Sequence, residues 1–493
     1  MKKTLEGKDI VVIGSGVGGL STGIILSLLD YDVTVVEKNS LPGGLMRSYR
    51  RSGIDCPVGV HYVGALGKDE PLGRMFGLLG VSVEDLFERM GLDGVIDRYI
   101  FDDFTFDLPV GIDAYEKNLL DFFPQDKAAI GLIMENIREI SRRMLAPSFI
   151  LNSGDPFQNI DYLSSMGELL EKLGVSDGLR DVLAVPVQLI GVPMAECPVI
   201  FHHMVLAGYL FSSWRLKEGG SKMADIFARR FVELGGHLIL GDGAGEILIK
   251  SGKVAGLRLQ SGETLTASAV IAAIHPKVLL GLLPTEALKS SYRQRVLNLK
   301  ETGGVIAVQV SVDAPAYRLL NHNIYRLPAK DRGGPASGFF CQLRRGNAEG
   351  ANLLSIISES SYGEWQRWEN SQSGRRGGEY EDKKMNMAVD LLREAGAVVE
   401  NILNPVIVDV FTPLTLRDFV NSPEGSCYGV MRSQAQLLKI ASLNNIPLAG
   451  LYLAGQNALA PGVLGSILGS FNAARLVAGA ERFMRELKLD KQG

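Results

Sequence analysis

Three glycines near the start of the chain have a spacing that could do chemistry. Gly14, Gly16 and Gly19 fit the pattern G-x-G-x-x-G, between the apolar run DIVVIG and a segment with helical periodicity. The first glycine permits a tight turn, the second lets the backbone approach a pyrophosphate, and the third lets helix and strand pack closely. The N–H groups at the start of such a helix attract phosphates. The spacing therefore predicts a dinucleotide-binding site.

An acid stands where this kind of site needs one. Glu37 ends the next apolar run, YDVTVVE, at a position from which a carboxylate can bind ribose hydroxyls. Residues 9–37 are therefore a predicted strand, helix and strand. The glycine pattern by itself does not distinguish NAD from FAD.

Further elements that would position this site recur in the middle and at the end of the chain. Residues 221–236 form a predicted helix, and residues 237–274 a set of short strands joined by tight turns. LYLAG is a predicted last strand, and a helix follows it through about residue 486. Residues 75–210 have long amphipathic stretches and are predicted to be mostly helical, whereas residues 371–384 are polar and glycine-rich and are predicted to be an exposed loop.

This distribution predicts an α/β protein with two domains. A Rossmann-type βαβ unit with a central parallel sheet would form the first domain, and a mixed α+β domain would hold the substrate. The nucleotide-binding domain is expected to be discontinuous, because its strands lie in three separated segments. The expected boundaries are 1–74, 211–289 and 441–493 for the nucleotide-binding domain, and 75–210 and 290–440 for the substrate domain.

Composition excludes some function classes. The 493 residues carry a net charge of −4, which gives no global reason to bind nucleic acid. The four cysteines are far apart and form no CxxC, so we expect neither a metal site nor a disulfide framework. No stretch reaches the roughly 18 apolar residues that would span a bilayer. We expect a cytoplasmic protein, and a peripheral contact with a membrane surface stays open.

The residues after Glu37 resemble a flavin signature. Gly43, Gly44 and Ser48 match the pattern GGRxxS/T of the glutathione-reductase-like FAD-binding superfamily, which includes amine oxidases, polyene desaturases and Rab GDP-dissociation inhibitors. Leu45 stands where that pattern commonly has Arg. The resemblance implies that the first domain has the glutathione-reductase-like fold and binds FAD non-covalently.

The C-terminal stretch AGQNALAPGVLGSILGS extends the resemblance. Together with the strand before it, this stretch resembles the closing motif of the phytoene desaturase family, in which a loop and a helix lie against the flavin. The resemblance implies that the helix beginning near Val463 aims its N-terminus at the isoalloxazine. The segment IDCPVGVHYVG, residues 54–64, is similar to the FD-x-G-x-HY-x-G stretch of retinol saturases and carotenoid isomerases, with Pro57 in place of the usual Asp.

Two sets of site residues follow from these observations. His61 and Tyr62 are the candidates for a polar or proton-handling role beside the flavin, although His61 could also serve only in packing. No metal ligands are expected, and NADH or NADPH is a candidate electron donor. The residues expected to contact the cofactor are Gly14, Gly16, Gly19, Glu37, Lys38, Gly43, Gly44, Leu45, Ile247, Gly455, Gly462, Val463 and Gly465.

The resemblance implies an FAD-dependent oxidoreductase that desaturates, saturates or isomerises a hydrophobic polyene or isoprenoid. The apolar segment 199–214 could line a tunnel for such a substrate, rest on a membrane or form a buried core helix. Two alternatives stay open. One is a flavin amine oxidase, for which Lys222 would supply the lysine that such enzymes pair with water. The other is a non-redox prenyl or lipid carrier of the Rab GDP-dissociation-inhibitor type, which would have an impaired nucleotide site. The sequence does not indicate an oligomeric state.

Overall fold

The computed structural model describes residues 8–151, 163–313, 321–327, 338–346, 350–399, 402 and 404–487. The first seven residues of the predicted nucleotide-binding domain, and its last six, lie outside this set, as do parts of the predicted substrate domain.

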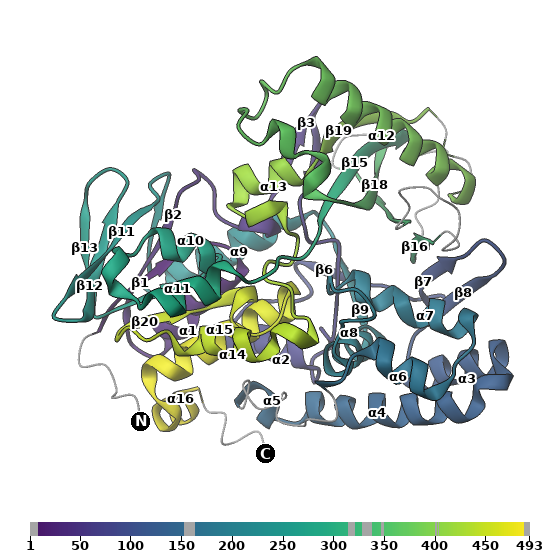
Figure 1. The fold of residues 1–493 in the computed structure, drawn as a ribbon, viewed down its shortest axis with the longest axis horizontal. Coiled ribbons are helices and arrows are strands. Elements are labelled where there is room, and N and C mark those ends of the chain that lie inside the picture. Colours follow the sequence, from purple (N-terminus) through teal and green to yellow (C-terminus); the bar gives the residue numbers. More distant parts are fainter. Residues whose placement is uncertain are drawn as a thin grey trace.

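A five-stranded parallel sheet forms one half of the molecule (Figure 1). Helix α1 (Val17–Leu28) connects its first two strands, which confirms the predicted strand–helix–strand unit. The sheet gathers strands from the beginning, middle and end of the chain, as the sequence predicted. Its order is β10 (His237–Leu240), β2 (Asp32–Glu37), β1 (Asp9–Ile13), β14 (Ala269–Ala272) and β20 (Leu451–Leu453).

Both faces of this sheet are covered. Because side chains alternate along a strand, Ile10 and Val12 of β1 enter one hydrophobic core, and Val11 and Ile13 enter another. The first core includes residues of α1, α9 (Gly220–Glu233) and α15 (Gly462–Ala478). The second lies under an antiparallel layer formed by β11 (Ala244–Lys250), β12 (Lys253–Leu259) and β13 (Thr264–Thr266). Burial on both faces explains the continuous apolar runs of β1, β2, β14 and β20.

A seven-stranded mixed sheet forms the other half. Its neighbours are antiparallel except for β16 and β7, which run parallel. Helix α12 (Gly378–Val398) covers its outer face. The strand order is β19 (Val406–Phe411), β15 (Gly304–Asp313), β18 (Ala351–Ser360), β17 (Phe339–Arg345), β16 (Asn323–Arg326), β7 (Val95–Ile100) and β8 (Thr105–Pro109).

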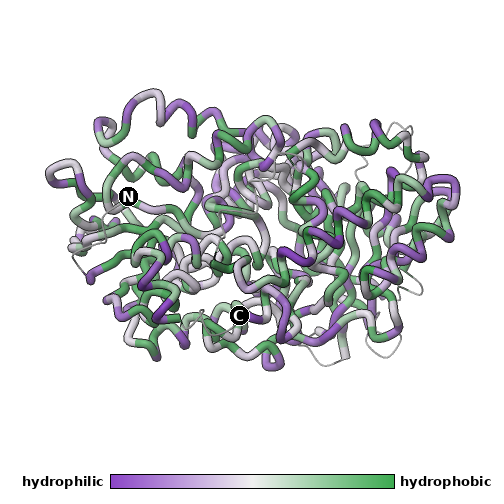
Figure 2. Tube along the Cα trace, turned by 90° about the horizontal axis from the view of Figure 1, so that it is seen from below, coloured by the Kyte–Doolittle hydropathy of each residue, from purple (hydrophilic) through white to green (hydrophobic). Residues whose placement is uncertain are grey.

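A group of helices packs beside this second sheet. Helix α8 (Val199–Phe211) lies at its centre and is buried nearly all round, which accounts for its apolar sequence. Figure 2 shows hydrophobic stretches in the interior of the molecule and hydrophilic residues on the outer turns. No single helix among the described residues is long and apolar enough to cross a membrane. The helices that pack against α8 are α3 (Ile112–Phe122), α4 (Lys127–Leu145), α6 (Met166–Leu173) and α7 (Asp177–Gln188), and α5 (Ser148–Leu151) lies against α4 and α15.

A second three-stranded sheet lies between the two halves, and short elements complete the fold. This sheet has the order β5 (Tyr62–Gly64), β9 (Ser213–Leu216) and β6 (Phe87–Arg89). The remaining elements are β3 (Ser48–Arg51), β4 (Ile54–Pro57), α2 (Pro71–Leu79), α10 (Pro276–Gly281), α11 (Ser290–Leu297), α13 (Pro413–Val420), α14 (Leu437–Ala441) and α16 (Ala480–Glu486).

Residues 75–210 are mostly helical, as predicted, with the short strands β6, β7 and β8 among the helices. Two other predicted elements were wrong in part. The predicted loop 371–384 ends at Gly378, where α12 begins, and Glu379 and Glu381 favour that helix start through its dipole. The terminal helix is broken at Gly479, whose φ of 83° separates α15 from α16.

Candidate active site

A cavity of about 840 Å³ lies between the two large sheets. On one side it is lined by residues at or just beyond the carboxyl ends of β1, β2, β14 and β20, which is where open parallel sheets bind their ligands. On the other side it is lined by residues of the seven-stranded sheet and of α8. One continuous space therefore reaches both the glycine-rich turn and the apolar half of the molecule.

The three glycines of the first motif have different surroundings. Gly14 has a φ of 96° and lies so close to Ala273 that an added Cβ would be 3.1 Å from its carbonyl oxygen. Gly16 lines the cavity, and a Cβ there would meet no atom within 4 Å. Gly19, which was also expected to contact the cofactor, does not line the cavity; it packs against the preceding turn, where an added Cβ would lie 1.8 Å from the carbonyl oxygen of Gly14. Of the three glycines, Gly14 and Gly16 are therefore the ones brought to the cavity.

Two helices begin at the wall of this cavity. The N-cap residue of α1 is Gly16, that of α15 is Pro461, and both line the cavity. Neither helix start has a side-chain capping hydrogen bond or an acidic residue in its first turn. The partial positive charge of each helix end is therefore available to an anionic group in the cavity.

Glu37 is fixed at the end of β2. One carboxylate oxygen accepts hydrogen bonds from the backbone N–H and the hydroxyl of Ser15, at 3.1 and 2.8 Å. The other accepts from the backbone and side chain of Asn39, at 2.9 and 2.7 Å. The adjacent Lys38 donates from Nζ to the carbonyl of Asp418 at 3.2 Å, and burial lowers its pKa. Both Glu37 and Lys38 line the cavity.

The predicted second signature also reaches the cavity. Gly43 and Gly44 have φ values of 120° and 53°, and the N–H of Gly43 donates to the carbonyl of Ser15 at 3.0 Å. These glycines and Leu45 line the cavity. Arg47 does not line it, because its guanidinium donates to the carbonyl of Leu41 at 3.3 Å.

The small residues of the C-terminal stretch serve two purposes: some line the cavity and others allow close packing of helices. Gly455, Gly462, Val463 and Gly465 line the cavity, and a Cβ on Gly462 would meet no atom within 4 Å. Other small residues let α15 and its preceding loop pack against α1. A Cβ on Gly18 would lie 2.5 Å from Cα of Gly455.

A buried arginine that the sequence did not single out fixes the loop between β20 and α15. Arg432 donates from Nε to the carbonyl of Leu459 at 2.7 Å and from its guanidinium to the carbonyls of Val430 and Gln456. Burial lowers its pKa to about 10. Arg432 therefore holds the backbone that approaches the cavity.

Ile247 is not brought to the cavity. It lies on β11 with its side chain fully buried in the core beneath the parallel sheet, and its N–H donates to the carbonyl of Leu282 at 2.8 Å. Gly243 and Ala244, earlier in the same segment, line the cavity instead.

His61 and Tyr62 lie at the start of β5, and both line the cavity. Burial and, secondarily, the charge of Arg344 lower the pKa of His61 to about 3, so this histidine is neutral near pH 7. Its Nδ1 has no hydrogen-bond partner among the described residues. His61 is therefore not a cationic acid in this state.

Aromatic rings surround Tyr62. Its ring stacks on Phe340 at a centroid distance of 5.9 Å and an interplanar angle of 10°, and it lies 4.6 Å from the ring of Tyr209. Tyr325 packs edge-on against Phe340 at 5.1 Å. All four rings line the cavity. No local sequence pattern marks this cluster, because its members come from β5, α8, β16 and β17.

Asp97, a buried acid that the sequence did not single out, lies next to these rings on the side away from the cavity. Asp97 on β7 is 1% exposed and accepts hydrogen bonds from the hydroxyl of Tyr62 at 3.1 Å and from the amide of Asn323 at 2.8 Å. The hydroxyls of Tyr62 and Tyr325 are 2.7 Å apart. Burial raises the pKa of Asp97 to about 7. An acid in an otherwise strand-like run, VIDRYI, is the only sequence signal for it.

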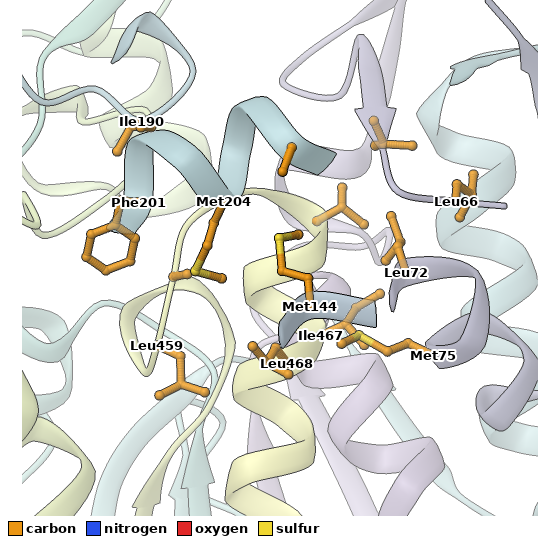
Figure 3. Packing of buried hydrophobic residues seen from close by; sticks show 14 of the residues in the cluster. Leu66, Leu72, Met75, Met144, Ile190, Phe201, Met204, Leu459, Ile467 and Leu468 are labelled. Carbon is orange, nitrogen blue, oxygen red and sulfur yellow. The ribbon is translucent and has the colours of Figure 1, made fainter. Parts of the chain in front are cut away.

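The end of the cavity beyond the rings is apolar. Figure 3 shows Phe201, Met204, Met144 and Leu72 gathered between α8 and the C-terminal helix α15. These four residues and Ile190 line the cavity. By contrast, His202 and His203 do not line it; their Nδ1 atoms are 3.0 Å apart in the core, and among the described residues no cluster of three or more metal-ligating side chains occurs.

Comparison with known proteins agrees with this geometry. The chain is 24% identical over 528 residues to the all-trans-retinol 13,14-reductase of Macaca fascicularis, covering 94% of this chain and 84% of that one. It is 25% identical over 527 residues to prolycopene isomerase 1 of an Oncidium hybrid cultivar, covering 99% and 85%.

Among solved structures, an oxidoreductase from Methanosarcina mazei has the same fold, with a TM-score of 0.67 at 17% identity and with 94% and 98% of the two chains covered. The family described as flavin containing amine oxidoreductase matches residues 17–480. The chain therefore belongs to the family of flavin-containing amine oxidoreductases and is a flavin-dependent oxidoreductase.

Proposed function

We propose that this protein binds FAD in the glycine-lined part of the cavity and acts on carbon–carbon double bonds of a hydrophobic polyene in the apolar part. The observation that carries the proposal is the continuity of the two parts, because a single space is lined by Gly16 and Glu37 at one end and by Phe201 and Met204 at the other. Saturation of a retinoid-like polyene is the favoured direction, since a retinol reductase is among the relatives that match along most of the chain.

The residues present suit FAD. The open space over Gly16 and the uncapped start of α1 suit a pyrophosphate, and the carboxylate of Glu37 suits ribose hydroxyls. The uncapped start of α15 suits the redox-active ring system, whose reduced form is anionic. A flavin bound here supplies hydride transfer to or from a substrate carbon.

The protein's own contribution is to hold the polyene and to exclude water. Apart from histidines, the charged side chains that line the described cavity are Glu37, Lys38 and Glu359. The walls near the rings of Tyr62 and Phe340 are mostly apolar or aromatic, and the neutral His61 is the neighbouring polar side chain, so a flat hydrocarbon chain can enter without meeting a charge there. Met144 and Met204 add adaptable apolar surface.

Flavin amine oxidation is a second candidate, because aromatic rings such as Tyr62 and Tyr209 can also frame an amine. Lys222 does not support it. This lysine, in the first turn of α9, forms an ion pair at 2.5 Å with Glu218, which precedes the helix, and it does not line the cavity. The carrier alternative is disfavoured because a Cβ at Gly16 would meet no atom, so nothing in the described chain fills the phosphate position.

The test uses purified protein reconstituted with FAD and reduced without oxygen. Mixed with all-trans-retinol, it should reoxidise its flavin and yield a product two hydrogens heavier by mass spectrometry. Putrescine and cyclohexylamine, added to the oxidised protein, should not bleach the flavin. Bleaching by an amine with no response to any polyene would overturn the proposal in favour of amine oxidation, and failure to bind FAD would favour the carrier.

A further inference from the structure

We propose that Asp97, Tyr62 and Tyr325 form a proton relay that ends in the cavity, and that Tyr325 exchanges its hydroxyl proton with a carbon of the substrate. This inference rests on the proposed function for its substrate. It assigns a proton source that His61 does not supply, because His61 is neutral and its Nδ1 has no partner among the residues that the structure describes.

The seven-stranded sheet builds the relay. Strands β7 and β16 run parallel in a register that sets Asn323 beside Asp97 and Tyr325 beside Tyr99. Asn323 donates to one oxygen of Asp97 at 2.8 Å and itself accepts from Gln342 at 2.9 Å. The amide network therefore fixes the carboxyl group and leaves its second oxygen to Tyr62.

Tyr62 is the middle member. Its hydroxyl contacts the carboxylate of Asp97 at 3.1 Å and the hydroxyl of Tyr325 at 2.7 Å. Tyr62 and Tyr325 line the cavity, whereas Asp97 does not. Asp97 is therefore a positioning and proton-storing residue, and Tyr325 is the end of the chain that a substrate can reach.

The protonation state of Asp97 sets the direction of both hydroxyls, because each phenol has one hydrogen to donate. When Asp97 is ionised, it takes the hydrogen of Tyr62, and Tyr62 in turn takes that of Tyr325. The hydroxyl oxygen of Tyr325 then presents only acceptor lone pairs to the cavity and no hydrogen. When Asp97 is protonated, it donates to Tyr62 and Tyr62 donates to Tyr325, so the hydrogen of Tyr325 is free to point at a substrate.

No cation counters the buried charge of Asp97 among the described groups that act on it. The titratable groups that face it are Tyr62 on β5, Tyr99 on β7, Tyr209 on α8 and Tyr325 on β16. The adjacent Arg98 is engaged with Asp107 of β8 at 2.7 Å. With its pKa raised to about 7 by burial, Asp97 populates both states near neutral pH.

The transfer balances in atoms and electrons. In saturation, the O–H bond of Tyr325 breaks and its proton forms a C–H bond with the electron pair of the former double bond. The neighbouring carbon receives the hydride that a reduced flavin supplies. Tyr325 regains a proton from Tyr62, and Tyr62 from Asp97; after the product leaves, water in the cavity restores the proton along the same chain. Desaturation reverses each transfer.

The variants that test the relay are Tyr325→Phe, which removes its end, and Asp97→Asn, which removes its titrating group. Tyr62→Phe removes the hydroxyl that connects Asp97 to Tyr325. It keeps the relay testable if either of the other two variants fails to fold. The matched control is Tyr31→Phe, because the buried hydroxyl of Tyr31 has no hydrogen-bond partner in the described part of the chain and the residue does not line the cavity.

The first readout does not depend on turnover. Infrared difference spectra of the purified protein should show a carboxylic acid C=O band that is lost with a midpoint near pH 7. Asp97→Asn should abolish the band. Tyr325→Phe should raise the pH midpoint of this band. Tyr62 then donates to the Asp97 carboxylate without itself accepting a hydrogen bond from Tyr325, so it stabilises the ionised form less. Tyr31→Phe should leave it unchanged. A wild-type protein without the band, or a midpoint unmoved in both Tyr325→Phe and Tyr62→Phe, overturns the relay.

The second readout is the pH profile of polyene saturation. Wild-type kcat should fall as pH rises through about 7. The kcat of Asp97→Asn should not show this fall. Tyr325→Phe should lower kcat by at least about tenfold with little change in KM, in the range expected for proton transfer by a positioned side chain. An unchanged kcat in Tyr325→Phe overturns the relay. If the infrared results hold but the wild type turns over no polyene, the proposed function fails, and with it the transfer to carbon.

Discussion

Replacing Gly16 with leucine should remove the cofactor while leaving the protein folded. Gly16 has φ and ψ of −64° and 176°, which any residue can adopt, and a Cβ there would meet no atom within 4 Å. We therefore expect a change in unfolding free energy within about 0.5 kcal/mol, as for a surface substitution. The new side chain would instead occupy the space in which we place the pyrophosphate.

The loss of affinity can be worked out from the helix start that Gly16 caps. A pyrophosphate displaced from the uncapped end of α1 loses at least two hydrogen bonds to a charged group, each contributing about 1.5 kcal/mol. The sum of about 3 kcal/mol corresponds to an FAD dissociation constant raised about 100-fold.

The assay is a fluorescence titration of the deflavinated protein with FAD, accompanied by thermal unfolding. Gly131→Leu is the matched control, because Gly131 lies on the exposed side of α4 and its Cβ would also meet nothing within 4 Å. An FAD affinity of Gly16→Leu within threefold of that of the control would refute our placement of the cofactor.

The remaining predictions concern stability and its dependence on pH. Gly18→Ala should destabilise the fold by about 1–3 kcal/mol in denaturant unfolding, because its Cβ would lie 2.5 Å from Cα of Gly455. Gly77→Ala is the control: this helical glycine has no described atom within 4 Å of an added Cβ, so the change should be neutral or stabilising. Equal effects of the two substitutions would contradict the packing role of Gly18. Arg432→Met should lower the stability by about 3 kcal/mol or more, since three buried carbonyls lose their donor, and the exposed Arg142→Met should change the melting temperature little. For Asp97 the folded pKa of about 7 exceeds the unfolded value of 3.8, so the folded state binds more protons between these values and stability should fall as pH rises, by up to about 1.4 kcal/mol per pH unit. Asp97→Asn should flatten that slope, and an unchanged slope would show that another group causes it.

The nucleotide-binding half could be predicted because its signals are local. The turn at Gly14, the helix after it and the acid at Glu37 lie within one short segment, and the apolar runs of β14 and β20 carry the pattern of strands buried on both faces. Gly16, Gly43 and Gly462, which the motifs single out as cofactor contacts, line one cavity although they lie far apart in the chain.

The relay residues could not be predicted, because their proximity depends on long-range strand register. Asp97 meets Asn323 and Tyr325 only because β7 pairs in parallel with β16, and no local pattern fixes that pairing. Ile247 shows the complementary error. Its segment was correctly identified as a strand, but alternation along β11 turns this side chain into the core and away from the cavity.

The central claim is that flavin and polyene share one cavity, and the most direct test is a spectrum. The anaerobically reduced, FAD-loaded protein should regain the oxidised flavin absorption when all-trans-retinol is added, with one saturated product formed per flavin. Val205→Trp, which fills the apolar end beside Met204, should slow this response without releasing FAD. A reduced flavin that stays reduced with every polyene tested, while an amine bleaches the oxidised form, would contradict the account.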